Sequence, residues 1–262
     1  MRWAMGVEYD GSAFCGWQIQ GQGRTVQGCL TAAVAKVADH PVALHCAGRT
    51  DAGVHASGQV VHFDTDADRT ERSWVLGTNV NLPDDVSVAW ARPVADEFHA
   101  RFSATGRHYR YEILNRPTRS SLERDRAVWS HRPLDERLMA EAASDLVGEH
   151  DFSSFRAIAC QAKSPVRTVY YLDVDRQGQR ISVRIGANAF LHHMVRNIAG
   201  VLIAIGEGRR PATWVRELLE VRDRTRGGVT APPQGLYLVG VDYPEHFGIP
   251  PPGASGSTVH SG

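Results

Sequence analysis

Lysine is nearly absent from this sequence of 262 residues: Lys36 and Lys163 are its two lysines, and the other basic residues are arginines. The planar guanidinium of arginine suits phosphate binding and stacking on bases. A GC-rich coding sequence would favour arginine equally well, so both explanations stay open. Net charge is also absent, because 29 basic and 29 acidic residues cancel. This balance excludes a chain coated in positive charge, but it leaves room for a local basic face that binds nucleic acid.

Cysteine is scarce, and its four copies, Cys15, Cys29, Cys46 and Cys160, contain no Cys-x-x-Cys pair. This spacing gives no indication of a zinc site or a thioredoxin-like motif. Four cysteines in a chain of this length do not make a disulfide scaffold. Reduced thiols are the simpler interpretation, and they indicate a cytoplasmic protein.

Long hydrophobic runs are missing as well. The most apolar stretch, residues 187–205, includes His192, His193 and Arg196, and it is too polar to span a bilayer. The N-terminal segment Met1–Glu8 acquires a charge too early for a signal peptide, since Glu8 interrupts the apolar stretch that such a peptide needs. We therefore expect a protein of the cytoplasm without a membrane partner. Hydrophobic residues make up 42% of the chain, which is enough for a sizeable core.

Apolar periodicity divides the chain into two similar series of elements. Thr25 can cap a helix, and apolar residues recur on one face of the segment that follows it. In the first half we predict strands 3–9, 44–47, 59–63 and 86–91 and helices 25–39 and 71–79. In the second half we predict strands 108–114, 166–174, 181–185 and 236–241 and helices 134–147 and 191–205, with an accessory helix over 212–222.

Each half has the order β-α-β-β-α-β, which is typical of a ferredoxin-like unit. The predicted fold class is therefore α+β, with two ferredoxin-like halves that form a shared antiparallel sheet with a central cleft. The predicted boundaries are 1–100 for the first half and 101–246 for the second. Residues 247–262 are rich in Pro, Gly and Ser, and we expect a disordered tail there.

The segment from Cys46 to His55 carries the clearest candidate for chemistry. It places one carboxylate, Asp51, between Arg49 and His55, with glycines on both sides. Glycines beside a charged cluster indicate a sharp turn or a close approach of a ligand, and a carboxylate in such a loop is a candidate catalytic group. Taken alone, the segment is slightly better explained as an ordinary Asp-Ala-Gly turn with a surface ion pair.

Eight segments spread over residues 3 to 243 decide between these two interpretations. In chain order they are 9–18, 25–27, 48–55, 98–103, 107–111, 151–155, 187–197 and 231–236. Together they resemble the tRNA pseudouridine synthase A family, whose catalytic motif matches Gly48-Arg49-Thr50-Asp51-Ala52-Gly53-Val54-His55. A single short match would be weak, whereas eight in the same order are specific.

The resemblance implies roles for five residues. Asp51 matches the essential aspartate, Tyr109 the tyrosine that stacks on the target base, and Arg196 the basic residue that pairs with the aspartate. Arg49 matches an arginine that holds the flipped-out position, and Leu236 an apolar residue near the target nucleoside. Because these residues come from both halves, the site is expected to form where the halves meet.

The resemblance also implies the reaction and the partners. The family converts uridine to pseudouridine at positions 38, 39 and/or 40 in the anticodon stem-loop of tRNA, with no metal and no organic cofactor, and it acts as a homodimer. A tRNA-binding chaperone without turnover is the main alternative, and a metal-dependent hydrolase is a distant third. The Arg209-Arg210 and Arg222–Arg226 clusters can be phosphate contacts or ordinary solvated surface.

Overall fold

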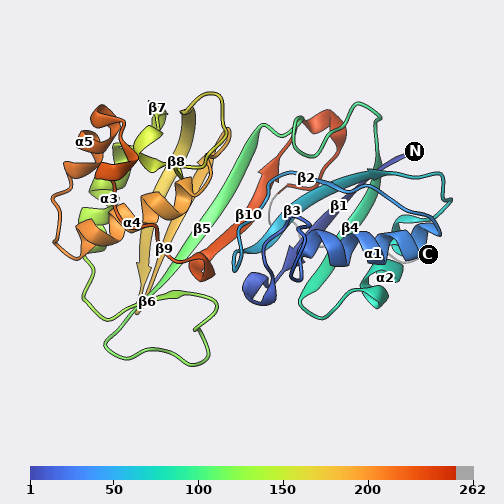
Figure 1. Cartoon of the computed structure of the whole chain (residues 1–262), viewed down its shortest axis with the longest axis horizontal. Helices are drawn as coiled ribbons and strands as arrows, with labels where there is room; N and C mark the ends of the chain where they lie inside the picture. Colours follow the sequence, from blue (N-terminus) through green and yellow to red (C-terminus); the bar gives the residue numbers. More distant parts are fainter. Residues whose placement is uncertain (252–262) are drawn as a thin grey trace. The chain divides into compact units, whose positions relative to one another are not determined.

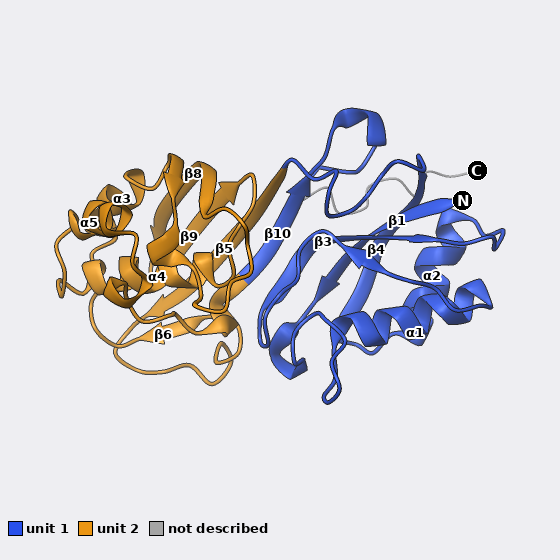
Figure 2. Ribbon diagram, turned by 45° about the horizontal axis from the view of Figure 1, so that its top comes forward, with its two compact units in different colours: residues 1–105, 237–262 blue, residues 106–236 orange. Residues whose placement is uncertain are grey.

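The computed structural model describes residues 1–251 and divides the chain into two compact units (Figure 2). Unit 1 contains residues 1–105 together with the described residues from Tyr237 on, and unit 2 contains Gly106–Leu236. The first division therefore follows Thr105 rather than residue 100. The described residues form ten strands and five α-helices, and the predicted α+β class is confirmed.

Unit 1 is a sheet covered by two helices on one face (Figure 1). Its elements are β1 (Arg2–Tyr9), α1 (Val26–Ala38), β2 (His45–Cys46), β3 (His55–Asp64), α2 (Glu71–Asn81), β4 (Val86–Val94) and β10 (Leu236–Asp242). The strand order is β4-β1-β3-β10, and β2 pairs with β3. β1 is antiparallel to both β3 and β4. The chain order β1-α1-β2-β3-α2-β4 is the β-α-β-β-α-β order expected from the sequence.

Local sequence explains where the helices of unit 1 begin. The Thr25 side chain accepts a hydrogen bond from the Gly28 N–H, and Thr70 does the same for Ser73, so each threonine satisfies an N–H that the first turn leaves unpaired. Trp74 of α2 is fully buried, and its ring centroid lies 5.8 Å from that of Trp3 and 5.1 Å from that of Phe63. These rings join α2 to the sheet.

The last strand differs from the sequence prediction. We expected residues 236–241 to complete the second half, but β10 runs parallel to β3, with Tyr237 opposite His55 and Leu238 opposite Ala56. A parallel partner cannot be joined by a tight hairpin, so this pairing links segments far apart in the sequence. After β10, Phe247 packs against Phe98 at a centroid distance of 5.2 Å. The first residue of the expected tail, 247–262, is therefore packed within unit 1. The rest of that tail, residues 252–262, lies outside the described residues.

Unit 2 is built on a second sheet. Its elements are β5 (Gly106–Asn115), β6 (Val128–Ser130), α3 (Glu136–Ser144), β7 (Gly148–Asp151), β8 (Val166–Gln177), β9 (Arg180–Ala187), α4 (Met194–Gly206) and α5 (Trp214–Val221). The order β5-β9-β8-β7 is antiparallel throughout, and β6 runs parallel to β5. The predicted strands 166–174 and 181–185 are present as β8 and β9, which form a hairpin with Gly178 at φ +59° in its turn. The short strands β6 and β7 were not predicted.

Two helices of unit 2 begin later than their apolar patterns predict. Asp135 caps α3 by accepting hydrogen bonds from the N–H groups of Arg137 and Leu138, so Leu134 stays outside the helix. His193 has φ +61°, a left-handed conformation that ends the preceding segment, and α4 therefore starts at Met194 instead of residue 191. Within the described residues, no helix is long and apolar enough to cross a membrane.

Candidate active site

The loop between β2 and β3, residues 47–54, carries Arg49 and Asp51 and is fixed at its start by β3. The Ala47 N–H donates to the Val60 carbonyl at 2.8 Å. Gln59, which is fully buried, donates from Nε2 to the Gly48 carbonyl at 2.6 Å and accepts from the Gly48 N–H at 3.3 Å. The Gln59 amide thus extends the strand pairing by one residue with its side chain, and it sets where the loop begins.

Hydrogen bonds of Thr50 hold the middle of the loop in place. The Thr50 hydroxyl lies 2.8 Å from the Tyr9 hydroxyl in a buried hydrogen bond, and the Thr50 carbonyl accepts from the Trp17 N–H at 3.0 Å. The Val54 N–H donates to the Asp51 carbonyl at 3.2 Å and closes a turn in which Gly53 has φ +76°. A non-glycine residue would be strained at that φ. The half-buried Asp51 therefore lies in a rigid turn.

Residues 11–17 pack directly against this loop. Two of the eight segments that resemble the family, 9–18 and 48–55, therefore lie in contact. A Cβ atom on Gly11 would lie 2.0 Å from the Val54 carbonyl oxygen. Gly16 has φ +95°, and a Cβ atom there would lie 2.8 Å from the Thr50 carbonyl oxygen. Only glycine permits this approach of one backbone to another.

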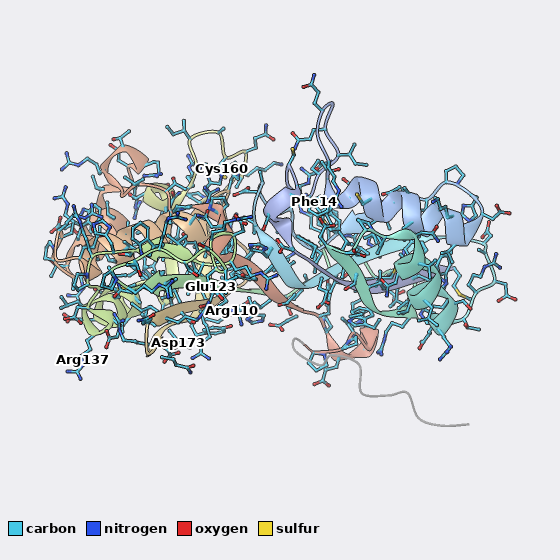
Figure 3. The ribbon with its side chains drawn as sticks, turned by 90° about the horizontal axis from the view of Figure 1, so that it is seen from below. Phe14, Arg110, Glu123, Arg137, Cys160 and Asp173 are labelled. Carbon is cyan, nitrogen blue, oxygen red and sulfur yellow. The ribbon has the colours of Figure 1, made fainter. Side chains whose placement is uncertain are left out.

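The same 11–17 segment is anchored on its other side. Phe14, labelled in Figure 3, is buried. The guanidinium carbon of Arg24 lies 4.3 Å from the centre of its ring. Arg24 binds both carboxylate oxygens of Asp85, at 2.6 and 2.7 Å. The Asp10 N–H donates to the Asp85 carbonyl at 3.0 Å. The support beneath the candidate catalytic loop is therefore connected to the residues just before β4.

His55, which follows the loop at the start of β3, has a structural role that the sequence did not indicate. It is buried, its Nδ1 accepts the Gly11 N–H at 3.0 Å, and the same atom lies 3.2 Å from the Asp10 carboxylate. Its ring stacks on Tyr237 of β10 at 4.6 Å. His55 thus ties the 11–17 segment and β10 to the end of the loop, and sequence reasoning missed this function because both partners are distant in the chain.

Arg49 is exposed and places positive charge near Cys46. Burial raises the pKa of the Cys46 thiol to about 11, and the charges of Arg49 and Arg101 act against that rise. Cys46 is therefore a protonated thiol at neutral pH rather than a nucleophile, since the thiolate is the reactive form. The two arginines mark the loop surface as locally basic although the whole chain is neutral.

In unit 2, Tyr109 lies in the middle of β5, opposite Ile185 of β9. It is half-buried, and the edge of its ring meets Phe190 at a centroid distance of 5.0 Å. Two residues along the same face, Tyr111 is fully buried and donates from its hydroxyl to the Pro232 carbonyl at 2.8 Å. Burial raises the pKa of the Tyr111 hydroxyl well above its usual range, so this group remains a neutral hydrogen-bond donor.

Arg196 lies in the first turn of α4 and is held by the segment that leads to Leu236. Its Nε donates to the Ala231 carbonyl at 2.8 Å, and the Ala231 N–H donates back to the Arg196 carbonyl at 3.0 Å. Leu236 is buried at the start of β10. The preceding residue, Gly235, lies so close to β5 that a Cβ atom added to it would be 2.7 Å from the Glu112 carbonyl oxygen. The segment from Ala231 to Leu236 therefore runs from Arg196 to the strand that carries Tyr109.

A buried polar network next to Arg196 was not foreseen. Asn197 donates from Nδ2 to the Phe155 carbonyl at 2.7 Å, and its Oδ1 accepts from Arg224 at 3.0 Å and from Thr230 at 2.7 Å. Arg224 belongs to one of the two basic clusters considered as phosphate contacts, and its guanidinium also donates to the Thr230 hydroxyl. This arginine binds groups of its own unit and holds α4 in place.

His192 and His193 precede α4 instead of lying within it, and their ring centroids are 4.0 Å apart. Imidazole nitrogens are donors that transition metals accept. That no metal takes part in the reaction stays a prediction. Of the residues with expected roles, unit 1 carries Arg49 and Asp51 on one rigid loop, and unit 2 carries Tyr109, Arg196 and Leu236 around β5 and α4.

Comparison with known proteins adds a strong likeness. A family model described as "tRNA pseudouridine synthase" matches residues 5–103 and 142–244. A protein of Methylococcus capsulatus named "tRNA pseudouridine synthase A" is 60% identical over 95% of this chain and 92% of its own length. A protein of the same name from Nitrosococcus oceani is 61% identical over 95% of this chain and 96% of its own length.

Proposed function

The chain belongs to the tRNA pseudouridine synthase family of isomerases, and on that premise we propose that it converts uridine to pseudouridine at positions 38, 39 and/or 40 in the anticodon stem-loop of tRNA. The observation that supports the proposal is the fixed turn that carries Asp51, which matches the family's essential aspartate by resemblance: the loop is held by Gln59, Thr50 and Gly16. Precise positioning of a catalytic group requires that the residues around it hold it rigidly.

The chemistry begins with access to the base. A uridine inside a stacked stem is out of reach, so it must leave the stack, at a cost of a few kcal/mol. Asp51 then acts as a nucleophile or as a base, and the bond between uracil N1 and ribose C1′ breaks. The detached uracil turns in the pocket and bonds to C1′ through C5. The proton on C5 leaves and N1 gains one, so the product has the same mass as the substrate.

The other candidate residues have supporting roles in this proposal. Tyr109 offers the detached uracil a flat surface, and base–aromatic stacking is worth about 1–3 kcal/mol. Arg196 is oriented by its two hydrogen bonds with Ala231, and a guanidinium near Asp51 would favour the ionised carboxylate. Leu236 would keep water from the intermediate. Arg49 would hold the position vacated by the flipped nucleotide.

This division of roles requires the loop of unit 1 to meet the Tyr109 and Arg196 region of unit 2, as the resemblance to the family implies. We likewise propose that the enzyme acts in the cytoplasm as a homodimer and needs neither metal nor cofactor. Sedimentation at micromolar concentration tests the dimer. Activity that persists after prolonged treatment with a chelator would exclude a metal-dependent hydrolase as the function.

The decisive experiment compares the wild type with Asp51→Asn, which keeps the shape of the side chain and removes its charge. Tritium release from tRNA that carries 5-tritiated uridine measures the loss of the C5 proton. We expect the wild type to release tritium and Asp51→Asn to release none above background. Asp84→Asn, which neutralises an exposed carboxylate of the same unit, is the matched control and should behave like the wild type.

Carbodiimide mapping of the product then locates the pseudouridine. Modification at positions 38, 39 or 40 supports the assignment, whereas modification elsewhere would redirect it to another uridine. If the wild type binds tRNA but neither releases tritium nor leaves a carbodiimide mark, the protein is the tRNA-binding module without turnover. Wild-type rates in Asp51→Asn would show that another group starts the reaction.

A further inference from the structure

The segment Phe98–Ser103, at the end of unit 1, presents an aromatic side chain to solvent on a firmly held backbone. Phe98 and Ala100 are fully buried, yet Phe102 is 75% exposed. Single exposed apolar residues are common and need no explanation by themselves. Phe102 is different because of the groups that surround it and because of the number of bonds that fix its loop.

The loop is fixed by hydrogen bonds from several elements. The Ala100 N–H donates to His62 Nδ1 at 3.1 Å, and the Ala100 carbonyl accepts from the Tyr243 hydroxyl at 2.6 Å. His99 Nδ1 accepts the N–H groups of Arg101 and Phe102, at 3.1 and 3.3 Å. The backbone beneath Phe102 is therefore set before any ligand arrives, which lowers the entropy lost on binding.

The Phe102 ring is part of a continuous series of aromatic rings. Its centroid lies 4.3 Å from that of His99, which lies 4.5 Å from His62 and 5.5 Å from His45. His62 is buried and serves as the support, while His99 is half-buried and Phe102 forms the outer surface. Burial lowers the pKa values of both His62 and His99, so these rings are neutral at pH 7, and they meet edge to face as uncharged rings.

Positive charge completes the arrangement. The guanidinium carbon of Arg101 lies 5.6 Å from the centre of the Phe102 ring. Arg101 also acts on the Cys46 thiol together with Arg49, so it lies on the side of unit 1 where the candidate catalytic loop begins. An exposed aromatic ring with an arginine beside it is the combination by which proteins bind unpaired nucleotides, the ring taking a base and the guanidinium a phosphate.

We propose that His99, Arg101 and Phe102 form a second RNA-binding point, the Phe102 platform, on which an unpaired nucleotide of the tRNA other than the target uridine stacks while Arg101 binds the adjoining phosphate. This inference rests on the proposed function for its choice of ligand. In this proposal the Phe98–Ser103 segment helps to bind the substrate and takes no part in breaking or forming bonds. The platform should therefore affect tRNA affinity and leave the chemical step unchanged.

The test measures the Kd for an unmodified tRNA transcript, by filter binding at several salt concentrations, and the single-turnover rate at saturating protein. Phe102→Ala should weaken binding about 5- to 150-fold, the range for loss of one stacked base. Phe102→Tyr keeps a flat ring and should bind within about twofold of the wild type, whereas Phe102→Leu keeps only the apolar volume and should resemble Phe102→Ala. The single-turnover rate should stay within about twofold in all three.

Arg101→Gln addresses the phosphate contact. It should reduce the slope of log Kd against log salt concentration by about 0.7–0.9, the contribution of one phosphate. Val80→Ala removes another exposed apolar side chain of unit 1, 85% exposed on α2, and serves as the control that should leave Kd unchanged. Because Phe102 is mostly exposed, its variants should melt within a few degrees of the wild type.

Several outcomes would overturn the proposal. Unchanged tRNA affinity in Phe102→Ala would remove the platform from the RNA-binding surface. A large loss of thermal stability with unchanged Kd would assign Phe102 a structural role, and altered sedimentation with unchanged Kd would assign it to a protein interface. These readouts are independent of turnover: if the wild type releases no tritium, the proposed isomerisation fails while the binding comparison still decides the platform.

Discussion

His62 gives the most quantitative prediction about this protein, because its ring is buried among other positive or ionisable groups. It is 2% exposed, and its Nδ1 accepts the Ala100 N–H. Burial, followed by the neighbouring His99, His45 and Arg2, lowers the pKa of His62 from 6.5 to about 4. Between pH 6.5 and about pH 4, His62 therefore binds a proton in the unfolded chain and stays neutral in the folded protein.

The sign and size of the effect follow from this difference. As the pH falls from 6.5 toward 4, the unfolded chain binds a proton at this position and the folded chain does not, so the free energy of unfolding decreases. With pKa values of 6.5 and about 4, His62 alone lowers the free energy of unfolding by about 1 kcal/mol between pH 7 and pH 5.5, and by about 2 kcal/mol by pH 4.5. Above pH 7 the effect vanishes, because neither state binds the proton.

The comparison variant is His62→Asn, whose amide oxygen can accept the Ala100 N–H in place of Nδ1. Urea unfolding at pH 7.0, 6.0 and 5.5 gives the free energy of each protein, and the wild type should lose about 1 kcal/mol more than the variant over this range. The pKa of His99 is also lowered, so only the difference between the two proteins isolates His62.

An independent readout follows the His62 imidazole itself by NMR. Its carbon-bound proton resonance, identified by its disappearance in His62→Asn, should titrate below pH 5. A midpoint between pH 6 and 7, or the same pH dependence of unfolding in both proteins, would refute the argument that burial controls this group.

Two further predictions address contacts that support the candidate site residues. Gly11→Ala places a Cβ atom 2.0 Å from the Val54 carbonyl and should destabilise the protein by about 1–3 kcal/mol and slow tritium release, while Gly21→Ala, with nothing within 4 Å, should change neither thermal stability nor rate. Arg224→Gln breaks the charged hydrogen bonds to Asn197 and Thr230 and should lower the free energy of unfolding by about 1–3 kcal/mol. The salt dependence of tRNA binding should stay unchanged in Arg224→Gln, and a shallower slope would show that this arginine contacts phosphate instead.

The sequence by itself determined the elements whose signals are local. Thr25 and Thr70 cap the helices of unit 1, and alternation along 108–114 and the Gly178 turn specify strands of unit 2. These features depend on neighbouring residues, so periodicity and capping are enough to predict them. The family could also be recognised from the sequence, because its motifs and their order can be identified without knowledge of the fold.

Only the tertiary structure decided how distant segments combine. It paired β10 with β3, and it turned Arg224 inward to Asn197. It also brought His45, His62 and His99 together beneath the exposed ring of Phe102. No local pattern specifies such contacts, because they depend on the packing of elements far apart in the chain, where burial and hydrogen bonding of one segment are completed by another.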